Sequence, residues 1–437
     1  MIGEQFLVKI EDMAFRGYGV ARIKGKVVFV PFSATGDEGW IEIVEEKRQY
    51  AIGKLTELTH PSPWRVHPPC PYFGVCGGCQ WQHIDYSLHG KIKEDILKDI
   101  LRRLGKVKEI PPVTVAPLPK PYDYRVRVQL KVEKNRMGYF RERSHQLVDI
   151  DHCPVSHPMV NQIILFLRRE RLSFPPIEEI EVNVSPEEAR GILILHPLRG
   201  HPIAEVFVHK LLQANADLKG VAIAGTEGLI PYGDPYLHFT LVFSRFGEKH
   251  SLRLRISPGS FYQVNPEQNQ TLIETVLEFG EINRRQRVLD LYAGVGNLTL
   301  PLGTEADRVW GIEENGTAVE DGRFNAQLNG MERCHFIQGA VEDVLSRWEE
   351  GSPDLVVLDP PRTGCKGIVN RIAALKPEKI VYVSCDPATF ARDAGLFSEK
   401  GFELRKITLI DMFPQSYHME TVGLLTKSSK SQITTSK

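Results

Sequence analysis

The chain has 437 residues, of which 42% are hydrophobic and 25% charged, and its net charge is −1. This composition is typical of folded domains, and the length predicts two to four of them, each with its own core. The near-neutral charge excludes a uniformly basic surface, and no apolar run approaches the roughly 18 residues that span a membrane. Residues 1–5 lack the basic start of a secretory signal, so we expect a cytoplasmic protein without membrane association.

Short β-rich runs separated by glycines fill residues 1–58. Three of them are Phe6–Ile10, Lys26–Val30 and Gly39–Val44. Such closely spaced runs predict a small five-stranded barrel of the OB type, a fold that often binds nucleic acid but does not by itself show binding. Five prolines between positions 61 and 71 then mark a linker.

Residues 59–255 are predicted to form a central α+β domain. Hydrophobic residues recur at helical spacing over residues 85–104, and one more helix is expected near residues 160–169, among alternating strands and turns. Residues 91–145 carry 15 Lys and Arg against 7 Asp and Glu. The alternation of basic and apolar residues at 124–131 predicts a strand with one basic face, which fits either RNA or plain solvent.

Four of the seven cysteines lie in two short contexts of this central region. Cys70, Cys76 and Cys79 have the spacing C-x5-C-x2-C, and Cys153 precedes a proline. In a cytoplasmic protein this spacing predicts a metal site rather than disulfides. Three close cysteines with a distant fourth favour a 4Fe-4S cluster. Zinc stays open as an alternative, because histidines near the cysteines could also serve as ligands.

Strand–helix repeats over residues 256–426 predict a doubly wound parallel sheet, and the Ser/Thr/Lys-rich tail 427–437 is predicted to be disordered. In the first repeat, Gly294 and Gly296 form a tight turn through which the backbone can approach a ligand. Glu313 ends the next strand, where a carboxylate can bind ribose hydroxyls. The third glycine of a dinucleotide fingerprint is absent, so a nucleoside without phosphate, S-adenosylmethionine, is the expected ligand.

Two further strands are predicted to end at reactive side chains. Asp359 follows one of them and begins an Asp-Pro-Pro motif, which also occurs in amino-nitrogen methyltransferases. Cys385 follows the other, and Asp386 and Pro387 are suited to the cap and first turn of a helix. A helix N-terminus favours thiolate, the nucleophilic form, although a buried structural cysteine is the alternative reading.

In this order, the motifs resemble the RNA uracil-C5 methyltransferase family over nearly the whole chain. The resemblance implies an α/β class I methyltransferase fold with a Rossmann-like sheet, an N-terminal TRAM barrel and a central cluster-binding domain. It rests on the barrel, the four cysteines and the following motifs: Phe261-Tyr262-Gln263-Val264-Asn265, the Gly294 loop, Asp359-Pro360-Pro361-Arg362, Ser384-Cys385-Asp386-Pro387, Asp411-Met412-Phe413-Pro414 and His418-Met419-Glu420-Thr421.

The same resemblance implies the roles of individual residues. Cys385 corresponds to the nucleophile that adds to uracil C6, which calls for a low-pKa thiol, and Glu420 corresponds to the base that removes the C5 proton. Contacts to the methyl donor fall at Gln263, Tyr292, Asn297, Glu313 and Asp359. The cysteine quartet resembles the branch that methylates 23S rRNA and carries a 4Fe-4S cluster, with Cys70, Cys76, Cys79 and Cys153 as ligands.

We therefore expect methylation of uridine C5 in 23S rRNA, by a monomer without an obligate protein partner. The same reaction on tRNA is the nearest alternative, followed by an amino-nitrogen methyltransferase and by an inactive RNA-binding assembly factor. The chain also departs from the family's pattern. Gln415-Ser416-Tyr417 replaces a frequent His-Thr-Gly, and Asp386 replaces a common Asn, which tends to raise the pKa of Cys385 unless Asp386 caps the helix.

Overall fold

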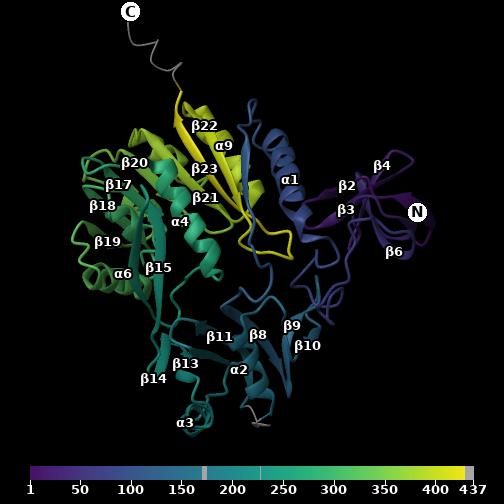
Figure 1. Cartoon of the computed structure of the whole chain (residues 1–437), viewed down its shortest axis with the longest axis horizontal. Coiled ribbons are helices and arrows are strands. Elements are labelled where there is room, and N and C mark those ends of the chain that lie inside the picture. The colour runs from purple at the N-terminus through teal and green to yellow at the C-terminus, as the bar shows by residue number, and fades with distance from the viewer. Residues whose placement is uncertain (170–174, 227, 429–437) are drawn as a thin grey trace, which may run out of the picture.

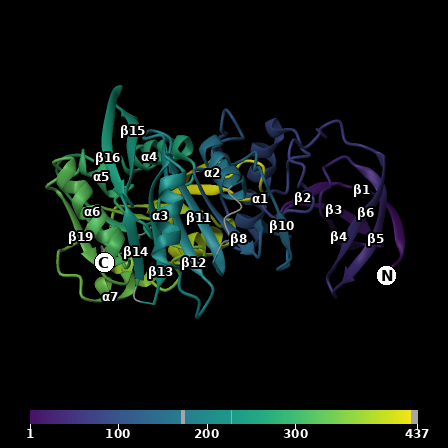
Figure 2. The same ribbon diagram turned by 90° about the horizontal axis from the view of Figure 1, so that it is seen from below.

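A computed structural model describes residues 1–169, 175–226 and 228–428. The tail predicted to be disordered, 427–437, lies outside the described residues apart from its first two positions. Figures 1 and 2 show the N-terminal sheet at one end of the molecule and the large C-terminal sheet at the other. In the described part of the chain, no helix combines the length and the apolar character needed to cross a membrane.

The N-terminal unit is a six-stranded sheet in the order β1-β5-β6-β4-β3-β2, one strand more than the sequence predicted. The additional strand, β2, has only three residues, too few to show the alternation that predicts a strand. Alternate apolar side chains of the other strands form a separate small core. The strands are β1 (Gln5–Lys9), β2 (Asp12–Ala14), β3 (Tyr18–Ile23), β4 (Lys26–Val30), β5 (Glu38–Glu46) and β6 (Tyr50–His60).

The central unit is a seven-stranded sheet in the order β10-β9-β8-β11-β12-β13-β14. Its helix α2 (Pro158–Arg169) was predicted, but α3 (Glu205–Ala214) was not. The start of α3 has three consecutive apolar residues, Val206–Val208, as a short strand can have, and only Val208 and Leu211 of the helix are buried. The strands are β8 (Arg127–Glu133), β9 (Arg136–Phe140), β10 (Leu147–Asp149), β11 (Ile177–Ser185), β12 (Arg190–Pro197), β13 (Leu218–Gly225) and β14 (Gly228–Gly233).

The C-terminal unit is an eight-stranded sheet in the order β19-β18-β17-β20-β21-β23-β22-β7, and it confirms the doubly wound prediction. The strands from β19 to β21 run parallel, so their carboxyl ends share one edge, where such sheets bind ligands. The strands after the first helix are β17 (Arg287–Leu291), β18 (Arg308–Glu313), β19 (Cys334–Gln338), β20 (Leu355–Leu358), β21 (Lys379–Ser384), β22 (Phe402–Ile410) and β23 (Glu420–Lys427). The helices are α4 (Pro266–Gly280), α5 (Thr299–Gly303), α6 (Gly316–Leu328), α7 (Val341–Ser346), α8 (Val369–Ala374) and α9 (Pro387–Glu399).

A segment from far upstream completes this C-terminal sheet. The short 3-10 helix η1 (Tyr86–Leu88) leads into α1 (His89–Arg103), which packs against α9. Strand β7 (Val113–Ala116) then pairs in parallel with Ile407–Ile410 of β22. Figure 1 shows α1 beside the C-terminal strands. The segment that the sequence placed in the central region therefore supports the C-terminal sheet.

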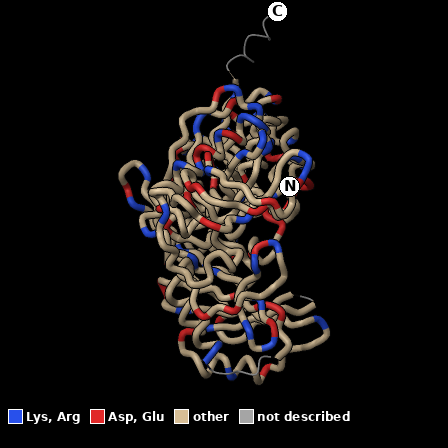
Figure 3. The backbone as a smooth tube through the Cα atoms, turned by 90° about the vertical axis from the view of Figure 1, so that its right-hand side faces the viewer, with Lys and Arg blue, Asp and Glu red and all other residues tan. Residues whose placement is uncertain are grey.

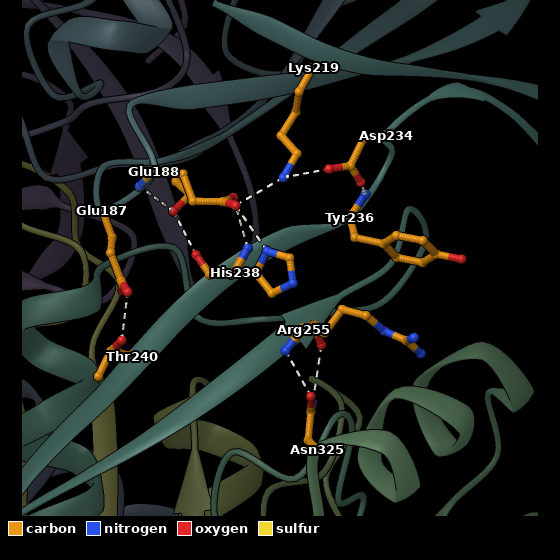
Figure 4. A network of polar contacts seen from close by, with 10 residues as sticks. Glu187, Glu188, Lys219, Asp234, Tyr236, His238, Thr240, Arg255 and Asn325 are labelled. Atoms are coloured by element: carbon orange, nitrogen blue, oxygen red, sulfur yellow. Dashed lines mark hydrogen bonds and ion pairs between the residues drawn. The ribbon is translucent and has the colours of Figure 1, made fainter. Parts of the chain in front are cut away.

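A hairpin of β15 (Leu237–Arg245) and β16 (Glu248–Ile256) bridges the two larger units through a polar network (Figure 4). Glu188, in the turn between β11 and β12, accepts hydrogen bonds from Lys219 Nζ at 2.9 Å and from the His238 amide at 3.0 Å. On the other strand of the hairpin, the Arg255 amide donates to Asn325 Oδ1 of α6 at 2.7 Å. These bonds fix the hairpin against both units.

The predicted basic strand face is neutralised by its neighbour in the central sheet. Arg127 of β8 pairs with Glu181 of β11 at 3.0 Å, and Lys131 pairs with Glu179. Figure 3, which shows the right-hand side of the view in Figure 1, has Lys and Arg mixed with Asp and Glu along the backbone. Of the two readings of this strand, the geometry favours an internally paired, solvated face over a free basic surface.

Candidate active site

Cys385 lies where the sequence predicted it, between the end of β21 and the start of α9. The Asp386 carboxylate caps the helix by accepting hydrogen bonds from the Ala388 and Thr389 amides, each at 2.9 Å. Pro387 occupies the first turn, where its missing amide hydrogen costs nothing. These contacts hold the thiol at the ligand-binding edge of the sheet.

The electrostatic surroundings of Cys385 differ from the expectation of a low-pKa thiol. Burial, followed by the negative charges of Glu420 and Asp359, raises the pKa of the thiol to about 12. Arg362 opposes this increase, and Asp386 adds the smallest contribution to it. The direction of this shift is opposite to the low pKa expected at a helix N-terminus, because burial and two carboxylates disfavour the thiolate. The capping role of Asp386 accounts for its small effect.

Two carboxyl groups, a buried one and a half-buried one, lie near enough to this thiol to influence its charge. Glu420 is the first residue of β23, is 3% exposed, and its Oε1 has no hydrogen-bond partner among the described residues. Burial and the charge of Asp359 raise the pKa of Glu420 well above its usual value, against the effect of Arg362. Asp359 directly follows β20, and burial raises its pKa to about 7. Three strand ends thus bring together the Cys385 thiol and two carboxyl groups of high proton affinity.

The loop of residues 411–419, which leads into Glu420, is anchored along its length. Asn265 Nδ2 donates to the Met412 carbonyl at 3.2 Å, and the Tyr124 hydroxyl donates to the Pro414 carbonyl at 3.1 Å. His418 is half-buried, and desolvation, together with the Arg362 charge, lowers its pKa to about 3, so its ring is neutral at pH 7. The loop therefore presents Glu420 from a fixed backbone.

A second hollow lies at the start of the sheet, around the glycine turn. Gly294 and Gly296 have φ values of +55° and +97°, which favour glycine. The Glu313 carboxylate accepts a hydrogen bond from the Gly294 amide at 3.0 Å, so it reaches the turn from the next strand. Four of the five predicted donor contacts line this hollow together: Gln263, Tyr292, Asn297 and Asp359.

An adjoining cavity of about 320 Å³ extends this hollow between the β15–β16 hairpin and α4. Gln263 and Asn297 line both spaces. Thr299, where a dinucleotide fingerprint has its third glycine, donates from Oγ1 to the buried Asp290 at 2.6 Å. A glycine cradle, a ribose-type carboxylate and no basic phosphate ligand among the lining residues fit an adenosyl donor.

The four predicted cysteine ligands line one cavity of about 340 Å³. Arg362 and His418 line the same cavity, which therefore opens toward the reactive site. Among the residues that the structure describes, no three His, Cys, Asp or Glu side chains converge as a single metal ion requires. The cysteines therefore surround a space rather than a point.

One buried residue of this region was not singled out from the sequence. Lys93 of α1 is 0% exposed and contacts the loop that carries Glu420. In the sequence it counted only toward a basic surplus. The helical spacing could have indicated that Lys93 is buried. Lys93 lies four residues after His89 and four residues before Leu97, and both of these are buried on the inner face of α1.

The comparisons with known proteins agree with this geometry. Residues 246–428 match the family tRNA (Uracil-5-)-methyltransferase, and residues 1–56 match the TRAM domain. An uncharacterized RNA methyltransferase of Aquifex aeolicus is 34% identical over 423 residues, which cover 95% of this chain and 97% of that protein. One from Oceanobacillus iheyensis is 32% identical over 454 residues, covering 97% and 96%.

A solved structure covers almost the whole chain. The crystal structure of Pyrococcus abyssi tRNA (uracil-54, C5)-methyltransferase in complex with S-adenosyl-L-homocysteine has a TM-score of 0.73 and 26% identity. The match covers 96% of this chain and 100% of that one. Together with the strand-end cysteine and carboxyl groups, these similarities show that the chain belongs to the family of TRAM-containing RNA uracil-C5 methyltransferases, which use S-adenosylmethionine.

Proposed function

We propose that this protein is a cytoplasmic enzyme that methylates uridine C5 in 23S rRNA. The observation that carries the chemistry is the grouping of Cys385, Glu420 and Asp359 at adjacent strand ends. A C5 methyltransferase needs a nucleophile and a base on one pyrimidine ring, and the site supplies both. An amino-nitrogen methyltransferase would leave Cys385 without a role, and an inactive assembly factor would not need the grouping at all.

The reaction begins with the uracil ring, whose C5 is a poor nucleophile. Addition of the Cys385 thiolate at C6 forms the C6–S bond and moves the electron pair of the C5–C6 double bond toward C5 as an enolate. S-adenosylmethionine, when bound, would supply the methyl group that C5 takes, and its S–CH3 bond would break to leave S-adenosylhomocysteine. Glu420 then accepts the C5 proton, the electrons of that C–H bond restore the double bond, and the C6–S bond breaks to release thiolate.

The protonation states that Cys385 and Glu420 need for the reaction suggest a role for Arg362. The Cys385 thiol must lose its proton before addition, although burial and the carboxylates hold its pKa near 12. Arg362 lowers the pKa of both Cys385 and Glu420, and so favours the thiolate and the carboxylate that the reaction uses. Since Cys385 is half-buried at the end of β21, we expect the target uridine to leave its stack to reach the thiol.

The methyl donor is assigned to the hollow around the glycine turn. Glu313, the last residue of β18, is assigned to the ribose hydroxyls, as its position at the strand end predicts. Gln263, Tyr292, Asn297 and Asp359 are assigned the remaining contacts, since they line one space beside the turn. This arrangement puts Asp359 between the donor and Cys385.

Cys70, Cys76, Cys79 and Cys153 are assigned as the ligands of a 4Fe-4S cluster. They line one cavity, as a shared centre requires. A zinc ion needs sulfur ligands about 2.3 Å from one point. The four cysteines surround a wider space, which suits a four-iron cluster better than a single ion. The proposed methylation needs no redox step, so we assign the cluster a structural role.

Methylation of tRNA is a second candidate, because the matched family and the Pyrococcus abyssi structure are both described as tRNA enzymes. The cysteine quartet supports the ribosomal assignment, through the resemblance to the 23S rRNA branch. Mapping 5-methyluridine in both RNAs from cells with and without this protein separates the two. Loss of the modification from 23S rRNA alone supports the proposal, and loss from tRNA alone overturns it.

A further inference from the structure

We propose that Lys93 is a positioning residue for Glu420, through the backbone of the loop of residues 411–419. The inference rests on the proposed function and adds a residue to it. Lys93 touches no reacting atom. It binds both ends of the loop, and so fixes where the Glu420 carboxylate meets the C5 proton.

The contacts of Lys93 span the loop. Its Nζ donates to Asp411 Oδ1 at 2.6 Å, at the first residue of the loop. The same Nζ donates to the His418 carbonyl at 2.6 Å, near the last residue, with a longer contact of 3.5 Å to the Phe413 carbonyl. An ammonium group has three protons, so these three acceptors match its full capacity.

The C-terminal end of the loop, next to Glu420, is confined by its surroundings. His418 lies two residues before Glu420, and Met419 between them is 0% exposed. Since Glu420 Oε1 has no hydrogen-bond partner among the described residues, side-chain bonds to that atom do not orient the carboxylate. Its position therefore depends on the backbone, and the nearest side-chain clamp on that backbone is Lys93.

A buried lysine is costly unless it is paired and hydrogen-bonded. Burying Lys93 with Asp411 meets this condition, but an apolar pair would close the same core without desolvating two charges. What an apolar pair cannot do is donate to the His418 carbonyl. The lysine thus provides a directional contact to the catalytic loop in addition to filling space.

The inference identifies which step fails without Lys93. Thiolate addition and methyl transfer precede the use of Glu420 as a base. A displaced Glu420 leaves the C5 proton in place, so the double bond is not restored and the C6–S bond does not break. The RNA then stays attached to Cys385 with its new methyl group, and the attached fraction can be measured.

The test compares K93M, K93R, E420Q and C385A, with K91M as the matched control. Lys91 is on the same helix but is exposed and paired with Asp95. Each protein is incubated with substrate RNA and S-adenosylmethionine, and the covalent methylated adduct is measured on denaturing gels. We expect K93M to lose roughly 10- to 100-fold in kcat with little change in KM, as misplacement of a catalytic group does. Its adduct fraction should rise toward that of E420Q.

K93R should recover part of the turnover, because a guanidinium can also donate to the His418 carbonyl. K91M should behave as the unmodified protein. A folded K93M with normal kcat, or one that loses methylation without adduct, overturns the role of Lys93. If K93M does not fold, the double variant K93M/D411N is used, because it also removes the charge of Asp411 that K93M leaves buried and unpaired. Its kcat, KM and adduct fraction are interpreted as for K93M. Absence of adduct with E420Q, together with full activity of C385A, overturns the proposed mechanism instead.

Discussion

The carbonyl of Gln415 accepts hydrogen bonds from the backbone amides of both Gln80 and Trp81, each at 3.1 Å. Gln415 has a φ of +69°, which turns its carbonyl toward this segment. Cys79 directly precedes Gln80, and Glu420 follows five residues after Gln415. A backbone junction therefore joins the cysteine segment to the loop that carries the proposed base.

This junction gives the proposed cluster site a measurable structural consequence. Protein purified without oxygen should be brown and contain about four irons per chain. C79S should lose iron and also turn over more slowly, because the Gln80–Gln415 contact depends on the ordered cysteine segment. C334S, which replaces a cysteine in the methyltransferase core, should keep its iron. Colourless protein with one zinc per chain would contradict the cluster.

The nucleophile is tested by C385A together with RNA that contains 5-fluorouridine. The unmodified protein should form a stable covalent complex with this RNA, because fluorine at C5 cannot be removed as a proton. C385A should form none and should lose methylation while keeping its fold. C365A is the control, since Cys365 is 2% exposed in the core and away from the proposed chemistry. Activity retained by C385A would exclude the thiolate mechanism.

The raised pKa of Cys385 predicts slow alkylation of this thiol. Since the charge of Glu420 contributes to the increase, E420Q should lower the pKa and speed alkylation at a fixed alkaline pH. One pKa unit changes the thiolate fraction about tenfold, so a change of several fold is expected. D386N should have a smaller effect, because Asp386 contributes least. Iodoacetamide labelling of the Cys385 peptide, followed by mass spectrometry, measures both, and equal rates would contradict the electrostatic assignment.

Short sequence patterns predicted much of the site, but they could not predict contacts between residues far apart in the sequence. The strand and cap around Cys385 follow from β-branched residues and from Asp386, all within ten residues. Strand β7 was not predicted in the methyltransferase sheet, because its four residues pair with Ile407–Ile410, almost 300 positions away. Lys93 was missed because its acceptors, Asp411 and His418, lie on the loop that follows this distant strand. Nor does sequence spacing show that burial raises the pKa of Cys385.

Tyr417, where the family often has glycine, links the loop to the TRAM unit. Its ring meets Phe15 edge-on at 5.5 Å and lies 4.2 Å from the His418 ring. A double-mutant cycle of Y417G and F15A should give a coupling energy of about 0.5–1.5 kcal/mol in thermal or denaturant unfolding. Y417F, which keeps the ring, is the matched control and should retain the coupling. Additive effects of the two substitutions would show that the rings do not join the units.

The buried Asp290 makes stability depend on pH. Burial, followed by the charges of Asp359 and Glu313, raises its pKa from 3.8 to about 7, although the bond from Thr299 opposes the increase. The native state therefore binds a proton more tightly than the unfolded chain. The protonated Asp290 carboxyl group contributes in full to the free energy of unfolding below pH 4. This contribution is lost as the pH rises through about 7.

The unmodified protein should accordingly lose up to about 4 kcal/mol of unfolding free energy through this group between pH 4 and pH 8. D290N cannot titrate, and its amide oxygen can still accept the Thr299 hydrogen bond, so its loss over this range should be smaller. Denaturant unfolding of both proteins at several pH values gives the difference, which cancels the groups that the two share. Parallel pH profiles would show that Asp290 is ionised in the native state throughout, and would remove the raised pKa as the cause.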